Sequence, residues 1–319
     1  MRALLFVCLV SCHLEWGPEA PCATADKGAE VTVYTSAYPP VVAALRTLAS
    51  QRGLQVSFFQ AGSEKLAARL DTELAAGQTS ADLLLASDPL YYIALKRRRA
   101  LAPYASLRAL KLDHQWVDPD GAFVTARISL MGIAYVPKRL PAPPRAFVDL
   151  PPFHPTLPDA LGSGTMMTTA IAWHARYGAA FFTELRHKGA TASGGGTAVV
   201  DRLQRGEADL GVALLENVLL APGGGVAFVL PSDGGVIVPG QLALLAQSHH
   251  PEQAKRVYDF LLSPEAQAVF TAQALYSPFT DIAPPEGAPP LPTAPSAERY
   301  EQWADAQASV RAAWSSAWQ

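Results

Sequence analysis

Residues 31–86 read VTVYTSAYPPVVAALRTLASQRGLQVSFFQAGSEKLAARLDTELAAGQTSADLLLA, and this stretch decides the fold class. Three β-rich or apolar runs, residues 31–35, 54–60 and 81–86, predict strands. Between them, residues 41–50 and 63–75 show helical spacing of apolar side chains. Strands that alternate with helices predict an α/β lobe built around a mainly parallel sheet.

A second alternating series follows further along the chain. Residues 128–136 and 234–246 predict two long strands. The other predicted strands are 210–215 and 227–231, and the predicted helices are 91–100, 166–176, 179–187, 198–205, 251–262 and 264–275. Because the chain changes series at the two long strands, we expect a second lobe (residues 128–244) inserted into the first (residues 30–127 and 245–282).

Length and charge restrict the class of protein. The chain has 319 residues, of which 50% are hydrophobic, and this is enough for two lobes with substantial cores. A formal net charge of -3 offers no electrostatic basis for binding nucleic acid or an anionic membrane surface. The Gly-x-Ser-x-Gly, His-Glu-x-x-His and Walker motifs are missing from the sequence, so we do not expect an enzyme.

The amino-terminal 29 residues predict export. A short apolar run (residues 3–10) precedes Ser11 and Cys12, as in a signal peptide with a lipoprotein cleavage site, and lipidation is expected on Cys12. Cleavage after Ala25 is the alternative. The three cysteines, Cys8, Cys12 and Cys22, all fall in this leader and tether, so the folded body has no thiol or disulfide chemistry.

The carboxyl-terminal region (residues 283–319) begins with a proline-rich strap. Residues 283–295 predict a surface loop, and residues 298–318 predict a helix. The helix carries Trp303, Trp314 and Trp318, which we interpret as packing residues rather than as a ligand box.

Two turns of glycine and hydroxyl residues precede predicted helices. The first is Gly162-Ser163-Gly164-Thr165, and the second is Ser193-Gly194-Gly195-Gly196-Thr197. The first backbone N–H groups of a helix have no intrahelical partner, and glycine allows a ligand to approach them closely. Ser163, Gly164, Thr165, Ser193 and Gly194 are therefore candidate anion-binding residues.

Several segments together resemble the extracellular solute-binding proteins of ABC importers, in the type II periplasmic branch that includes ferric-iron, phosphonate and sugar-phosphate binders. They are residues 31–36, 80–85, 101–104, 163–165, 205–212 and 260–267. The resemblance covers nearly all of residues 31–275. It implies two lobes, two crossover strands and a ligand cleft between the lobes, and a partnership with a membrane permease and its ATPase subunit.

Polar residues follow three predicted strands at the edge where ligands gather in open α/β sheets. These candidates are Ser36 and Tyr38, Ser87 and Asp88, and Glu216 and Asn217. Two anion-type turns facing the same cleft favour a small anionic solute such as a phosphate ester or phosphonate, with Glu216 accepting a donor group of the ligand.

Two alternatives remain open. Ferric iron prefers anionic oxygen ligands, and Tyr38, Asp88 and Glu216 could supply them, although the adjacent tyrosines usual in the ferric binders are replaced by Glu216-Asn217. A ligand-sensing or adhesive surface lipoprotein is the second alternative, since a fold does not determine its use. In every case we expect no resident cofactor, a monomer, and membrane attachment only through a lipid.

Overall fold

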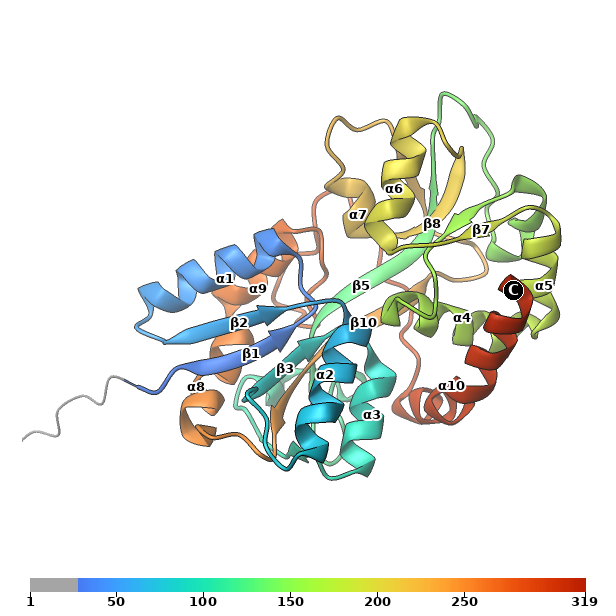
Figure 1. Ribbon diagram of the computed structural model, residues 1–319. Coiled ribbons are helices and arrows are strands. Elements are labelled where there is room, and N and C mark those ends of the chain that lie inside the picture. Colours follow the sequence, from blue (N-terminus) through green and yellow to red (C-terminus); the bar gives the residue numbers. More distant parts are fainter. Residues whose placement is uncertain (1–27) are drawn as a thin grey trace, which may run out of the picture.

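The computed structural model describes residues 28–319, and the predicted leader cleavage and Cys12 lie outside these residues. The strands form one ten-stranded mixed sheet in the order β2-β1-β3-β10-β5-β8-β6-β7, with β4 beside β10 and β9 beside β5. Two lobes share this sheet because two long strands run through both of them (Figure 1).

The first lobe confirms the alternating pattern of residues 31–86. Strands β1 (Val31–Thr35), β2 (Val56–Gln60) and β3 (Leu83–Ala86) pair in parallel, as predicted. Helices α1 (Pro39–Gln51), α2 (Ser63–Ala75) and α3 (Pro89–Arg97) connect them or follow them. The helices α8 (Pro251–Leu261) and α9 (Pro264–Ala272) and the short strand β4 (Leu101–Ala102) complete this lobe.

The crossover strands are β5 (Val124–Tyr135) and β10 (Val236–Leu245), which pair antiparallel to each other. Every residue of β10 is buried, and its sequence is apolar except for Gln241. The sequence prediction placed the start of β5 too late, at Ile128. The strand begins at Val124 and includes Arg127, whose charge interrupts the apolar run but not the backbone pairing.

The second lobe contains helices α4 (Gly164–Tyr177), α5 (Ala180–His187), α6 (Gly196–Arg205) and α7 (Leu215–Leu219). Its strands are β6 (Thr156–Leu157), β7 (Thr191–Ala192), β8 (Leu210–Leu214) and β9 (Ala227–Val229). The two short strands β6 and β7 were not predicted, because two residues carry no periodicity. Strand β8 ends one residue earlier than predicted, since Leu215 begins α7.

The carboxyl-terminal helix α10 (Ala297–Trp318) packs against α3 of the first lobe and against α4 and α5 of the second (Figure 1). Trp314 is fully buried, and its ring lies 5.2 Å from that of Phe182 between centroids. Its indole N–H donates to Asp159 over 3.2 Å. The interpretation of these tryptophans as packing residues is confirmed, because Trp303 and Trp314 belong to the main core and Trp318 packs against it.

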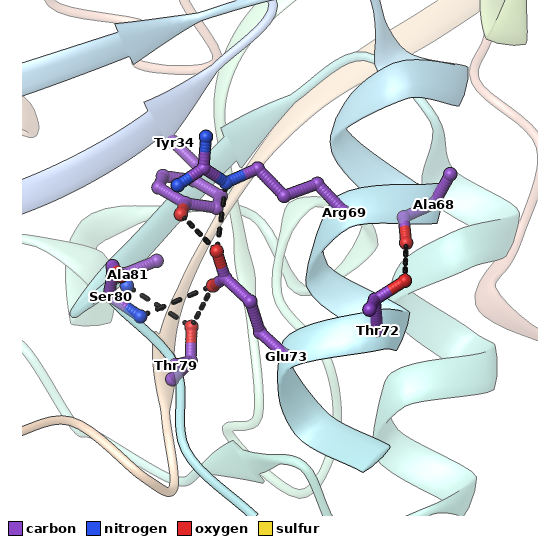
Figure 2. A network of polar contacts seen from close by, with 8 residues as sticks. All are labelled: Tyr34, Ala68, Arg69, Thr72, Glu73, Thr79, Ser80 and Ala81. Carbon is purple, nitrogen blue, oxygen red and sulfur yellow. Dashed lines mark hydrogen bonds and ion pairs between the residues drawn. The ribbon is translucent and has the colours of Figure 1, made fainter. Parts of the chain in front are cut away.

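A polar network holds α2 against the sheet (Figure 2). The carboxylate of Glu73 accepts hydrogen bonds from the Tyr34 hydroxyl on β1 (2.7 Å), from Arg69 one turn earlier (2.8 Å) and from the Thr79 hydroxyl before β3 (2.9 Å). Partial burial alone would raise the pKa of Glu73, but these donors outweigh it and lower the pKa below its ordinary value. Glu73 and Arg69 lie in the carboxyl-terminal half of α2, so the network holds this end of the helix against β1 and the loop before β3.

Within residues 28–319, no helix combines the length and the apolar character that crossing a membrane requires.

Candidate functional site

A cavity of about 170 Å³ lies between the two lobes, where strand ends and helix starts from both lobes meet the crossover strand β5. Its walls comprise Ser36, Tyr38, Gly62, Ser63, Ser87, Arg127, Ser129, Gly162, Ser163, Gly164, Thr165, Gly195, Gly196, Leu214 and Glu216. Most of these residues are glycines or carry hydroxyl groups, and two carry charge. The wall therefore offers hydrogen-bonding groups from both lobes.

Seven of the predicted site residues line this cavity. They are Ser36, Tyr38, Ser87, Ser163, Gly164, Thr165 and Glu216. Residues that are far apart in the sequence meet here because β1 and β3 of the first lobe run antiparallel to β8 of the second, so their carboxyl ends face each other along the crossover strands.

The other four predicted residues are not among the lining residues. Asp88 caps α3 and accepts a hydrogen bond from the Tyr91 backbone N–H over 3.2 Å. Ser193 accepts from the Arg202 guanidinium, and the carbonyl of Gly194 accepts from the Asp159 backbone N–H. Asn217 reaches towards Tyr38 instead. In the second glycine turn, the cavity wall is formed two residues later than predicted, by Gly195 and Gly196.

Three helices begin at the cavity wall. They are α2 at Gly62 and Ser63, α4 at Ser163 and Gly164, and α6 at Gly195 and Gly196. Each helix start carries partial positive charge and free N–H groups, so three starts around one small volume favour an anion. The sequence did not predict that the start of α2 would line the cavity, because Gly62-Ser63 does not differ from an ordinary turn.

The start of α4 touches the first lobe directly. A Cβ atom added at Gly164 would lie 3.1 Å from the Cβ of Ser63 and 3.1 Å from the Cβ of Asp88. That separation is tighter than ordinary van der Waals contact, so a side chain at this position would push Ser63 or Asp88 away by a few tenths of an ångström. The two lobes therefore meet around the cavity at the anion-type turn.

Arg127 on β5 is the most informative residue that the sequence reasoning missed. Its side chain is 2% exposed, and within residues 28–319 no carboxylate lies within ion-pairing distance of it. One guanidinium nitrogen lies 3.5 Å from the Ser36 hydroxyl, while Nε has no partner among the described residues. Burial lowers the pKa of Arg127, opposed by the nearby Glu216 and Tyr38. The sequence signal that could have identified Arg127 is its position as a charged residue within an otherwise mostly apolar strand.

Glu216, in the first turn of α7, is the acidic group of the cavity. Its Oε1 accepts a 2.7 Å hydrogen bond from the Ser129 hydroxyl on β5, while Oε2 has no partner within the described chain. Burial raises the pKa of Glu216 to about 7, although Ser129 and Arg127 pull it down. Burial also raises the pKa of the Tyr38 phenol well above its ordinary value, and the carboxylate of Glu216 adds to this effect. Tyr38 is therefore a neutral phenol at ordinary pH.

The arrangement suits a ligand with several anionic oxygens and one donor group. Arg127, the helix starts and the hydroxyl groups present donors, whereas Glu216 presents an acceptor. Of the three predicted iron ligands, Tyr38 and Glu216 line the cavity and Asp88 does not. Within residues 28–319, no group of three or more His, Cys, Asp or Glu side chains is arranged to hold a metal ion.

Two lobes, two crossover strands and a polar cavity between the lobes define a class of proteins that enclose small ligands. Comparison with known proteins agrees. Residues 29–274 match the model of the bacterial extracellular solute-binding protein family, and the chain belongs to this family. Its members serve ABC importers, and their fold is that of binding and transport proteins rather than of enzymes.

Several solved structures share the fold. Iron-bound HitA from Pseudomonas aeruginosa has a TM-score of 0.79 and 18% identity, over 89% of this chain and 99% of that chain. The ferric binding protein from Campylobacter jejuni has a TM-score of 0.77 and 17% identity, over 90% of this chain and 99% of that one. AfuA from Actinobacillus pleuropneumoniae, with fructose-6-phosphate bound, has a TM-score of 0.74 and 20% identity, over 89% and 97% respectively. The search of curated proteins found no match.

Proposed function

We propose that this protein captures a small anionic solute, such as a phosphate ester or phosphonate, and delivers it to an ABC permease. The observation that carries this proposal is Arg127, a fully buried cation with no carboxylate at ion-pairing distance in the described chain. A buried charge without an ion-pair partner is costly, and a bound anion would supply that partner. The sugar phosphate bound to AfuA, a relative in fold, is an anion of this kind.

The helix starts add to the same preference. Those of α2, α4 and α6 come from both lobes, so an anion between them would be held by first-lobe and second-lobe groups at once. Such a ligand favours the closed arrangement of the lobes, because it contacts both sets of donors only when they are close together. Closure about β5 and β10 would then present the loaded form to the permease.

Thermal unfolding of the full chain in the presence of candidate ligands tests this function. The panel contains sulfate, phosphate, phosphate esters, phosphonates, dicarboxylates, polyamines and ferric citrate. A ligand at about a hundred times its Kd adds about 2.7 kcal/mol to the free energy of unfolding, which raises the Tm. We expect stabilisation by phosphorylated or phosphonate compounds and none by polyamines.

The substitution Arg127→Met provides the decisive comparison. It should abolish stabilisation by anions and should not lower the Tm of the unliganded protein, because methionine fills similar space without a buried charge. The matched control is Arg205→Met, since Arg205 pairs with Glu207 at an exposed position on the far end of α6. Anion binding that persists in the Arg127→Met protein would refute the assignment.

Ferric iron is the second candidate, and one observation favours it. Tyr38 and Glu216, two oxygen ligands of the type that hard cations prefer, line the same cavity. The adjacent charge of Arg127 opposes a bare cation there, which is why we rank the anion first. Stabilisation by ferric citrate alone, with no effect of citrate, would reverse this order.

We also propose that the protein is exported and anchored through a lipid on Cys12, which lies outside the described residues. Metabolic labelling with a fatty acid should mark the wild-type protein and leave Cys12→Ser unlabelled. If neither the wild-type protein nor Cys12→Ser is labelled, cleavage after Ala25 is favoured. Adjacent permease and ATPase genes would support transport, whereas an adjacent sensor kinase gene would support a sensing lipoprotein.

A further inference from the structure

A second cavity lies beside the crossover strands, under the first turn of α10. Its volume is about 190 Å³, and it shares no lining residue with the cavity between the lobes. Its walls come from α3, from the loop before β5, from β5 and β10, and from α10. An apolar cavity of about 150 Å³ is known to accept benzene, so this volume accommodates a single six-membered ring with a substituent.

Most of the wall is apolar. The side chains of Ile93, Trp116, Phe123 and Tyr300 line the cavity, and each of them is less than 9% exposed. Three of these four are aromatic, so they present flat faces and edges of the kind that pack well on another ring. The body of a suitable ligand is therefore a small apolar ring.

One buried amide interrupts this apolar wall. The side chain of Gln241 on β10 is 6% exposed, and neither of its amide atoms forms a hydrogen bond within residues 28–319, although its Oε1 is completely buried. A register shift between Gly240 and Gln241 opposite β5 lies at this point, and such bulges redirect a side chain. Leaving a buried amide unpaired costs free energy, so Gln241 needs a partner that the described chain does not provide.

The chemistry of Gln241 indicates what that partner is. A glutamine amide offers one donor group and one acceptor side by side, and another amide edge satisfies both with two hydrogen bonds. Thr125 lies opposite Gln241 in the β5–β10 pairing and lines the same cavity, which adds a hydroxyl that donates or accepts.

Charges at the rim argue against an anion. Lys96 is already neutralised by Asp118 at 2.6 Å and Asp120 at 2.7 Å. Glu298, in the first turn of α10, adds a carboxylate to the lining. This cavity therefore has the opposite electrostatic preference to the cavity that holds Arg127.

We propose that the cavity under α10 binds a small uncharged molecule that combines one ring with an amide edge. This class of ligand differs from the anion proposed for the cleft, and the two cavities share no lining residue. Benzamide is a suitable probe because it has this shape and this edge. Benzoate is its matched control, since it has the same size but carries a negative charge and no amide donor.

Binding of both probes to the full chain is measured by isothermal titration and by saturation-transfer NMR. We expect benzamide to bind and benzoate to bind at least tenfold more weakly. Gln241→Leu should weaken benzamide binding about tenfold or more. Because that residue lies in the core, Ala297→Trp provides a second variant: Ala297 is an exposed residue at the rim, and the indole should block the entrance.

Arg127→Met separates this inference from the proposed function. It should remove anion binding in the cleft and leave benzamide binding unchanged, because Arg127 does not line the second cavity. The proposal is overturned if benzamide does not bind, if benzoate binds equally well, or if both Gln241→Leu and Ala297→Trp bind benzamide as the wild type does.

Discussion

The side-chain amide of Asn217 donates a 3.0 Å hydrogen bond to the hydroxyl of Tyr38, and this bond joins residues 179 positions apart in the chain. Tyr38 lies at the start of α1 in the first lobe, and Asn217 lies in α7 of the second. Both residues were predicted to contact a ligand from their places after strands. Their mutual bond shows that they contact each other across the cleft.

A double-mutant cycle with Tyr38→Phe and Asn217→Ala tests the strength of this contact. Each single substitution should lower the free energy of unfolding, and the coupling between them should be about 1 kcal/mol, as for a typical buried hydrogen bond. Urea denaturation of the four proteins measures it. Strict additivity would mean that the bond does not form between the lobes in solution.

Removing the hydroxyls of the α4 turn should weaken anion binding. For the double substitution Ser163→Ala and Thr165→Ala we expect a loss of a few kcal/mol at most, counting roughly 1.5–3 for each hydrogen bond to a charged group. Ser163 also caps α4 by accepting from the Met166 backbone N–H, so stability should fall by about 1 kcal/mol as well.

The control for that experiment is Ser263→Ala. Ser263 caps α9 through the same kind of contact, to the Ala266 backbone N–H, and is not among the residues that line the cleft cavity. Its loss should lower stability to a similar degree without changing affinity in a calorimetric titration. If the wild type, the Ser163→Ala and Thr165→Ala double variant and Ser263→Ala bind the anion with equal affinity, the α4 turn is not part of the site.

Anion affinity should depend on pH through Glu216, whose pKa burial raises to about 7. Above this pH the carboxylate repels an anion, and below it the neutral acid does not, so affinity should rise several-fold as the pH falls from about 8 to about 6. Sulfate is the appropriate ligand because it does not titrate in this range. Glu216→Gln should bind sulfate with an affinity that changes little with pH.

Titration of Asp88 is the other change near the cavity that would make anion affinity depend on pH. Burial, with a contribution from the charge of Glu64, raises the pKa of Asp88 to about 6, and Asp88 touches the start of α4. Asp88→Asn should retain the pH dependence centred near 7 if Glu216 causes it. Loss of the dependence in Asp88→Asn alone would transfer the assignment to that residue.

Stability in acid should depend on Glu73, the centre of the network in Figure 2. Its donors lower its pKa below the ordinary value of 4.5, so it contributes stability above about pH 4.5, and this contribution is lost as the pH falls through its folded-state pKa. Glu73→Gln should therefore be less stable than the wild type near neutral pH, by roughly 1.5–3 kcal/mol, and should approach it in acid.

Urea denaturation at several pH values checks this behaviour. Glu207→Gln is the control, since Glu207 forms an exposed pair with Arg205 and such pairs contribute little. A constant difference between Glu73→Gln and the wild type from neutral to acidic pH would show that the network acts through packing rather than through charge.

Local patterns in the sequence were sufficient for the helices other than α7, which was not predicted, and for the longer strands apart from the start of β5. The predicted helix at residues 63–75 and strand at 31–35 coincide with α2 and β1, because apolar spacing reports which face of an element is buried. Glycine and hydroxyl residues before α4 and α6 likewise identify free helix starts without any tertiary information.

Only the tertiary structure decided which of these groups share a cavity. Arg127 belongs to the site because β5 continues through both lobes and turns this side chain towards the cleft, and no local pattern records that direction. Asp88 caps its own helix, and Asn217 donates to Tyr38. Gly62 and Ser63, at the start of α2, line the same cavity as the starts of α4 and α6. The sequence determines elements through short-range periodicity, whereas the environment of a charge depends on strand pairing between residues more than a hundred positions apart.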